Sequence, residues 1–170
     1  IEMAYGVRTN LEWMYLLGNF GVVVHGAHKY IEELPDRIFF GSWTTQGLPF
    51  YSGNVTYQFL VNQKNDYLKI QVPYFHGALL KVYCDKQEVG NIAFLPYEIE
   101  IHGYGKGIHS IEITCYGNRS NSFGQVHQVG DYVHWKGADS WRSKGNLWSE
   151  EYQLIDFGIL TTPRIGDEII

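Results

Sequence analysis

The fold is most clearly indicated by residues Ile108-His109-Ser110-Ile111-Glu112-Ile113-Thr114-Cys115. Its period-2 alternation places Ile111, Ile113 and Cys115 on one face of an extended chain. Such alternation is typical of a β-strand that buries one face. The glycine-rich run at residues 103–107 lacks the ending of a phosphate-binding loop and leads into this strand, so it indicates a β-turn.

Similar short runs, rich in Val, Ile, Tyr and Phe, recur along the chain at a spacing of roughly ten residues, with turn signals between them. Asn65-Asp66 and residues 85–87 are such reversals. Windows with helical periodicity are few. The pattern predicts an all-β fold, an antiparallel β-sandwich or barrel. We expect strands at residues 11–17, 21–25, 54–61, 67–72, 78–84, 97–101, 108–116 and 152–160.

The composition indicates one domain with many rings. A chain of 170 residues has the usual length of a single domain, here 1–170. Aromatic residues make up 16% of it, while charged residues make up 18%, below the typical figure of about 25%. We expect residues 1–35 to form an N-terminal β flank built on the strand pair 11–17 and 21–25. Because the sequence starts at Ile1, we expect a domain excised from a longer chain.

Charge and hydropathy exclude two classes of partner. The net charge is −5 and no run of like charge occurs, which argues against a nucleic-acid partner. No apolar stretch approaches the roughly 20 residues that a membrane span requires. We therefore expect neither a nucleic acid nor a membrane as partner, and the sequence assigns no compartment.

The two cysteines, Cys84 and Cys115, fall on separate predicted strands. Neither has a histidine at a spacing typical of zinc sites, so the sequence favours buried free thiols. A disulfide between neighbouring strands stays open. His25 and His28 are expected on opposite faces of a strand, which disfavours a metal site there.

Aromatic rings beside polar side chains suggest carbohydrate binding. Rings gather at residues 43–51 and in a long polar loop at 117–149, and such loops are often functional. We expect the rings to stack on sugar faces while Arg119, Asn121 and His127 bond hydroxyl groups. The alternative is that these rings only complete the sandwich core. The candidate sugar contacts are Trp43, Tyr51, Arg119, Asn121, His127, Trp141 and Trp148.

Catalytic patterns are weak. Serine-nucleophile and metalloprotease motifs do not occur. Glycoside hydrolysis needs two carboxyl groups about 5 to 10 Å apart. Glu150 or Glu151 with Asp139 is one possible pair, although solvated surface positions explain these residues more simply.

Two sets of motifs carry a resemblance. Residues 79–90, 94–97 and 107–113 are similar to the galactose-binding-like jelly roll attached to many glycoside hydrolases, with Lys86-Gln87 where Gly-Lys is commoner. A second set resembles the C-terminal region of large bacterial glycosyl hydrolases of the α-L-rhamnosidase-like kind. Its segments are residues 16–22, 47–57, 117–124 with His127, and 148–154.

The resemblance implies a β-sandwich accessory domain of a bacterial glycoside hydrolase, with the catalytic acids in another domain. It implies no ligand residues at these positions. Jelly rolls of this kind often carry a structural calcium, but no dense Asp and Asn cluster identifies its ligands, and no other cofactor is expected. Three hypotheses follow: carbohydrate binding, a structural domain that docks on the catalytic domain, and a hydrolase in its own right.

Overall fold

A computed structural model describes residues 2, 4–9, 14–130, 141, 143–166 and 168–169. The described chain is almost entirely β-structure, with two short helical turns, η1 (Trp43–Thr45) and α1 (Ser120–Phe123). This confirms the predicted all-β class. The strands are β1 (Gly21–His25), β2 (His28–Glu32), β3 (Asn54–Gln63), β4 (Tyr67–Gln71), β5 (Phe75–His76), β6 (Leu80–Cys84), β7 (Gln87–Ile92), β8 (Glu98–His102), β9 (Gly107–Tyr116), β10 (Gly158–Ile159), β11 (Arg164–Ile165) and β12 (Glu168–Ile169).

Two four-stranded sheets form the body of the molecule. One has the strand order β3-β9-β6-β7 and the other the order β12-β11-β4-β8. The pairings within both sheets are antiparallel. A core of apolar side chains from both sheets lies between them, which confirms the predicted antiparallel β-sandwich.

Strand β9 contains the alternating stretch 108–115 and has the burial pattern that the sequence predicts. Along β9, buried positions alternate with more exposed ones. The buried side chains of β9 face those of β4 and β8 across the core. The fully or nearly fully buried apolar members of the two sheets are Tyr57, Leu68, Ile70, Leu80, Val82, Cys84, Ile92, Ile101, Ile111, Ile113 and Cys115.

Two predicted strands are wrong in the described residues. Residues 14–17 of the predicted strand 11–17 are not in a strand, and residues 11–13 lie outside the described part. β1 instead pairs with β2, which directly follows it. Of the predicted strand 152–160, only β10 is extended and paired, with β5. Both errors have the same origin: the apolar residues in these two segments indicate the buried face of a strand, but those at 14–17 and 152–157 lie outside the sheets.

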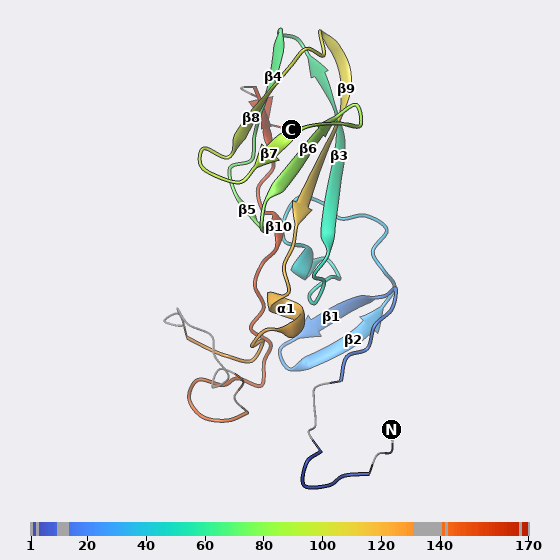
Figure 1. Ribbon diagram of the computed structural model, residues 1–170, viewed down its shortest axis with the longest axis vertical. Helices are drawn as coiled ribbons and strands as arrows, with labels where there is room; N and C mark the ends of the chain where they lie inside the picture. The colour runs from blue at the N-terminus through green and yellow to red at the C-terminus, as the bar shows by residue number, and fades with distance from the viewer. Residues whose placement is uncertain are drawn as a thin grey trace.

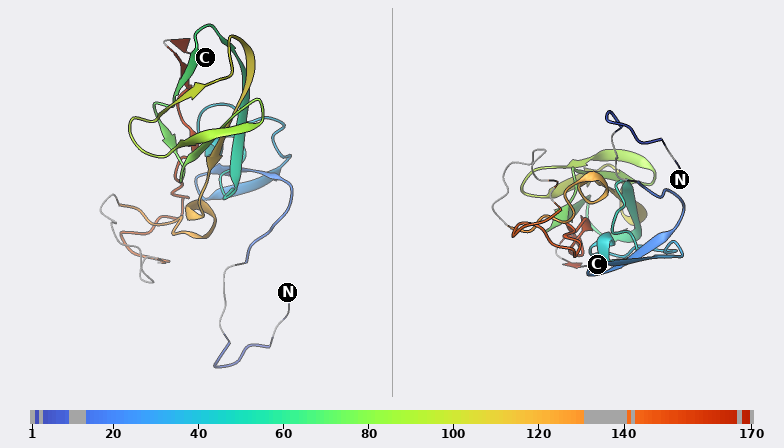
Figure 2. Two further views of the ribbon diagram at one scale, coloured as in Figure 1. Left: turned by 45° about the horizontal axis from the view of Figure 1, so that its top comes forward. Right: turned by 90° about the horizontal axis from the view of Figure 1, so that it is seen from below.

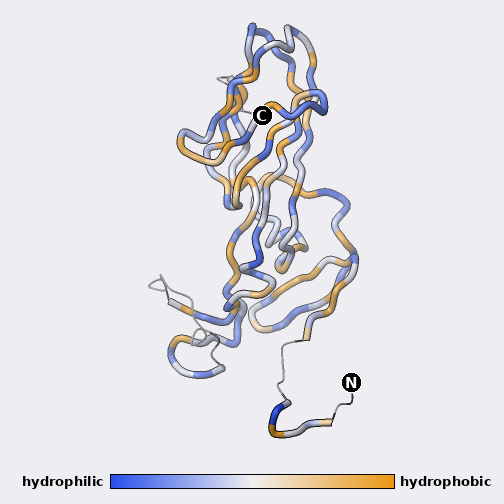
Figure 3. Tube along the Cα trace, viewed as in Figure 1, coloured by the Kyte–Doolittle hydropathy of each residue, from blue (hydrophilic) through white to orange (hydrophobic). Residues whose placement is uncertain are grey.

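The β1-β2 hairpin lies at the lower end of the sandwich in Figure 1, beside α1 and away from β4 and β8 (Figures 1 and 2). Its two-residue turn makes His25 and His28 direct cross-strand partners. They therefore share a face, contrary to the opposite faces expected from a continuous strand. The hydropathy trace shows apolar positions on this hairpin as well as on the sandwich strands (Figure 3).

The cysteines are both free and buried, as favoured from the sequence. Cys84 pairs with Ile111 and Cys115 pairs with Leu80 on the neighbouring strand. Four residues of strand separate them, about 13 Å at 3.3 Å per residue. A disulfide needs Cα atoms within about 7 Å, so the pairing that stayed open is excluded in this fold.

The predicted loop 117–149 is anchored at both ends. Its first part contains α1, and a bridge between Gln128 and Trp148 closes its second part. Backbone bonds from Val129 to Leu147 and from Ser149 to His127 support this bridge. Residues 131–140 and 142 lie outside the described part. No helix in the described ranges is long and apolar enough to cross a membrane.

Candidate functional site

A cavity of about 620 Å³ lies at the end of the sandwich that adjoins the hairpin, and we call it the N-terminal cavity. Five segments form its walls: the chain before β1, the hairpin itself, the loop after η1, α1 and Tyr152. The lining residues are Met14, Tyr15, Leu16, Leu17, Gly18, Phe20, Val22, Lys29, Tyr30, Ile31, Gly47, Leu48, Pro49, Phe50, Tyr51, Ser52, Gly53, Asn121, Ser122, Phe123, Val126 and Tyr152.

Backbone contacts hold these segments together. The amide of Val22 donates to the carbonyl of Gly47 at 2.8 Å, which joins β1 to the loop after η1. The Ser122 hydroxyl donates to the carbonyl of Phe50 at 2.6 Å and joins α1 to the same loop. A Cβ at Gly21 would lie 2.5 Å from the carbonyl oxygen of Glu33, so β1 requires glycine at this close approach.

Aromatic contacts line the interior. The rings of Tyr15 and Phe123 meet edge to face at 4.8 Å, and those of Phe50 and Tyr152 at 5.2 Å. The ammonium group of Lys29 lies 5.1 Å from the centre of the Tyr152 ring, within cation–π range. The walls are thus joined by ring contacts that bring together residues distant in sequence.

The rim of the cavity is apolar and exposed. The exposed fraction of the Met14 side chain is 81%, and that of Leu17 is 84%. Monomeric proteins rarely present such contiguous apolar surface without a function. We define the apolar rim as the lining residues that are both large and solvent-exposed: Met14, Tyr15, Leu16, Leu17, Tyr30, Ile31, Tyr51 and Phe123.

Three polar side chains of the cavity, those of Tyr51, Asn121 and Ser122, have protein partners. The Asn121 amide bonds both backbone groups of Ile155, and the Ser122 hydroxyl bonds Phe50. The Tyr51 hydroxyl donates to the carbonyl of Asn54 at 3.1 Å. Among the described lining residues there is no carboxylate or histidine. The cavity therefore offers apolar contact rather than acid–base chemistry.

Two predicted sugar contacts are corrected by burial. Trp43 is 0% exposed and its ring stacks on Phe157 at 6.0 Å, so neither face is open to a sugar. Asn121 is buried and uses its oxygen and its nitrogen on Ile155. Both residues stabilise the fold in the present structure.

The other predicted contacts are exposed or half-buried. Tyr51 belongs to the apolar rim, and Arg119 is exposed just before α1. The ring of His127 lies 6.1 Å from that of Trp148 and 4.6 Å from that of Tyr152. Trp141 is 51% exposed.

Sequence reasoning missed most of the cavity, including Tyr15, Tyr30 and Tyr152. Tyr15 and Tyr152 fall in residues 11–17 and 152–160, which we expected to be strands, and Tyr30 lies on β2, which we did not expect. Only the fold brings the three residues together. Of the proposed catalytic residues, Glu150 and Glu151 are exposed, and Asp139 lies outside the described residues.

Fold and site together define a β-sandwich domain with an apolar, ring-lined cavity at one end. No protein-family model matches the sequence, and no curated protein matches it. Among solved structures, a rhamnosidase from Novosphingobium sp. PP1Y is similar over 95% of this chain, at 18% identity and a TM-score of 0.52. This likeness shows the fold.

Two further matches are GH2 beta-galacturonidases from Eisenbergiella tayi, in structures bound to galacturonate and to glycerol. They cover 56% and 63% of this chain at 19% and 21% identity, with TM-scores of 0.39 and 0.41. The chain spans only 16% to 18% of the length of these three solved chains.

Proposed function

We propose that residues 1–170 are a non-catalytic accessory domain of a bacterial glycoside hydrolase, a galactose-binding-like jelly roll with residues 1–35 as its flank. Two observations support this proposal: the fold is similar to a part of a much longer rhamnosidase chain, and the sequence motifs resemble the same class. The catalytic acids then belong to another domain of the same polypeptide.

The role that the geometry supports best is docking on that catalytic domain. The apolar rim carries this proposal, because its side chains are exposed, while the polar atoms of Asn121 and Ser122 and the hydroxyl of Tyr51 are bonded within the domain. Burial of one leucine side chain stabilises a contact by roughly 1.5–3 kcal/mol. Interfaces between domains of one chain commonly bury about 600–1,500 Å². Several rim residues together supply an anchor of this kind.

Binding of the chain to the separately produced catalytic domain, measured by calorimetry, tests docking. The double variant Leu16→Ser/Leu17→Ser removes two rim side chains and is expected to weaken binding at least tenfold. The matched control is Leu60→Ser/Ile108→Ser, since both residues are 71% exposed on the sandwich. The control is expected to change binding less than twofold. Absence of binding by the wild type, or equal losses in both variants, would overturn docking.

A second candidate function is carbohydrate binding. The specific observation in its favour is the cavity itself, whose volume lies within the range of roughly 300–1,000 Å³ for ligand sites. Tyr51 on its rim, and His127 with Trp148 beside Tyr152, offer ring faces near one another. Arg119 and Trp141 are exposed and accessible.

Titration with rhamnose- and galactose-containing oligosaccharides up to millimolar concentration, followed by tryptophan fluorescence, tests the second function. Sugar binding predicts a saturable signal that Tyr51→Ala weakens and that Tyr67→Ala, exposed on β4, does not change. Docking predicts no saturable signal. The two experiments thus separate the two roles.

A further inference from the structure

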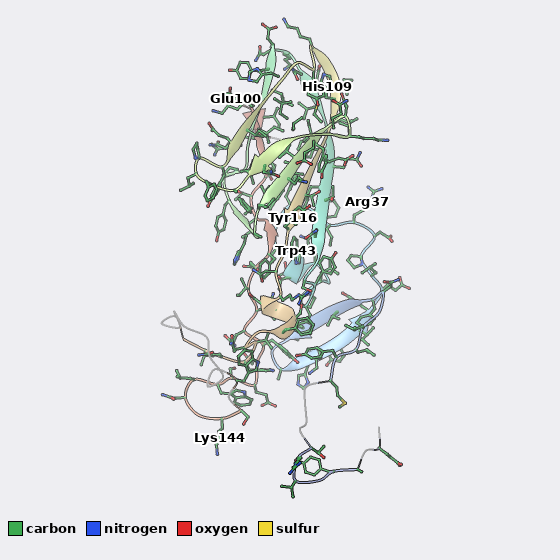
Figure 4. All side chains as sticks on the ribbon, in the orientation of Figure 1. Arg37, Trp43, Glu100, His109, Tyr116 and Lys144 are labelled. Carbon is green, nitrogen blue, oxygen red and sulfur yellow. The ribbon has the colours of Figure 1, made fainter. Side chains whose placement is uncertain are left out.

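A cluster of three different metal-ligating groups lies in the sandwich, on elements that do not line the N-terminal cavity. Cys84 ends β6, Asp85 follows it in the turn to β7, and His109 lies on the neighbouring strand β9. One ligand atom from each residue lies within 4.8 Å of the other two. In Figure 4, His109 lies in the upper part of the sandwich, far from Lys144 in the lower part of the molecule.

The turn between β6 and β7 places the carboxylate of Asp85. Asp85 and Lys86 have φ angles of 47° and 69°, as a two-residue hairpin turn requires. The amide of Asp85 donates to the carbonyl of Ser110 at 2.8 Å, and the amide of Ser110 donates to Oδ1 of Asp85 at 2.9 Å. With Oδ1 held in this way, Oδ2 lies 2.7 Å from Nδ1 of His109.

Both ring nitrogens of His109 face an oxygen atom. Nε2 lies 3.2 Å from the carbonyl oxygen of Gly105, which can only accept, so Nε2 carries the hydrogen of that bond. Nδ1 faces the carboxylate of Asp85. If the ring were neutral, the lone pair of Nδ1 would face a carboxylate oxygen of Asp85, and the two would repel each other. A positively charged species between the two atoms removes this repulsion. In the metal-free protein that species is a proton.

A metal ion satisfies the same arrangement. Histidines that bind metals usually donate their other ring N–H to a carbonyl or carboxylate, as Nε2 of His109 does toward Gly105. The sulfur of Cys84 adds a soft metal-ligating atom to the cluster. A hydrogen bond between Asp85 and His109 does not need this sulfur, whereas a metal site would use it. Sulfur, nitrogen and carboxylate oxygen together suit zinc-like ions better than calcium or magnesium.

We propose that Cys84 Sγ, Asp85 Oδ2 and His109 Nδ1 bind a divalent transition-metal ion of the zinc type, with the fourth position open. Tetrahedral zinc places such ligand atoms about 3.3–3.6 Å apart. The 2.7 Å contact therefore widens by about 0.6 Å on binding, and the sulfur moves closer. Binding releases the thiol proton of Cys84 and the proton between Asp85 and His109 to solvent.

The sequence prediction about zinc changes accordingly. Neither cysteine has a histidine nearby in sequence, yet the pairing of β6 with β9 brings His109, 25 residues later in the chain, beside Cys84. Asp85 is 46% exposed at its side chain, so an ion can reach the cluster from solvent. Cys115 has no place in the cluster, which makes it a natural control.

Titration of the full chain with Co²⁺, followed by absorbance, tests the site. The wild type is expected to bind one equivalent and to develop a thiolate-to-cobalt charge-transfer band in the near ultraviolet. Zn²⁺ is expected to displace the cobalt, whereas Ca²⁺ is not. Cys84→Ser is expected to lose the band, while Cys115→Ser retains it.

Two further measurements keep the proposal open to refutation if Cys84→Ser is unstable. Asp85→Asn keeps the shape of the turn and is expected to weaken Co²⁺ binding at least tenfold with an unchanged far-ultraviolet spectrum. Zn²⁺ is expected to raise the melting temperature of the wild type. A wild type that shows no near-ultraviolet band, or a band of equal strength in both cysteine variants, would overturn the site.

Discussion

The side chain of Asn121 bonds both backbone groups of Ile155. Its Nδ2 donates to the carbonyl oxygen of Ile155 at 2.8 Å, and its Oδ1 accepts from the amide of Ile155 at 2.9 Å. The hydroxyl of Thr44 in η1 donates to the same carbonyl at 2.9 Å. Ile155 therefore joins α1, η1 and the segment that leads to β10, and this junction supports one wall of the N-terminal cavity.

The first prediction concerns this junction. Asn121→Ala leaves the amide of Ile155 without its partner in a largely buried place, and we expect a loss of roughly 2–4 kcal/mol in the free energy of unfolding. Asn62→Ala, at an exposed position of β3, is the matched control and is expected to change it by less than about 0.5 kcal/mol. Urea denaturation measures both. Equal stability of the two variants would contradict the structural role of Asn121.

The sandwich was predictable because burial of one sheet face leaves a local signal. In β3 and β9 every second side chain enters the core, and this periodicity is present in the sequence itself. β2 left no such signal, because its five residues are all exposed. β10 is only two residues long. Phe157, the buried residue just before it, stacks on Trp43 and so links distant segments.

The site was less predictable, because its residues meet only through the fold. Trp43 and Tyr51 lie eight residues apart and look alike in sequence, yet Trp43 is buried and Tyr51 lies on the apolar rim. Composition signals an excess of rings but does not assign each one to core or surface. Tyr15 reaches Phe123 across the cavity, a contact that no local pattern encodes.

The second prediction concerns the thiols. Burial raises the pKa of Cys84 to about 11 and that of Cys115 to about 12, and both side chains are inaccessible. Because the thiolate is the reactive form, we expect neither cysteine to react with a disulfide reagent at pH 8 in the folded protein. Two equivalents are expected to react in denaturant. Leu60→Cys, at an exposed position, supplies a positive control with one rapidly reacting thiol. A rapidly reacting thiol in the folded wild type would contradict the prediction.

The third prediction concerns Gly158, which has a φ of +125°. A Cβ there would lie 2.8 Å from both the carbonyl oxygen of Gly41 and the hydroxyl of Tyr57. Gly103 also has a positive φ, +86°, but a Cβ at that position meets open space. Both alanine variants carry backbone strain of roughly 1–2 kcal/mol, while only Gly158→Ala adds the steric cost.

We therefore expect Gly158→Ala to be the less stable variant by about 1–3 kcal/mol, again by urea denaturation. If Gly158→Ala were as stable as Gly103→Ala, the close packing of β10 against Gly41 and Tyr57 would be wrong.

The last prediction concerns alkaline pH. Burial raises the pKa of Tyr57 to about 12 from 10.0, although its hydroxyl accepts a bond from the amide of Ile159 at 3.4 Å. The unfolded chain therefore ionises first, and stability is full below pH 10 and falls as pH rises toward 12. At pH 11 the loss from this one group is about 1.4 kcal/mol.

Tyr57→Phe is expected to lose less stability between pH 9 and pH 11 than the wild type, by about this amount. Tyr67→Phe, which removes an exposed phenol, is expected to follow the wild type, since its hydroxyl is not part of the core. Urea denaturation at each pH measures the slopes, and parallel slopes for Tyr57→Phe and the wild type would show that the phenol of Tyr57 is not kept neutral by the fold.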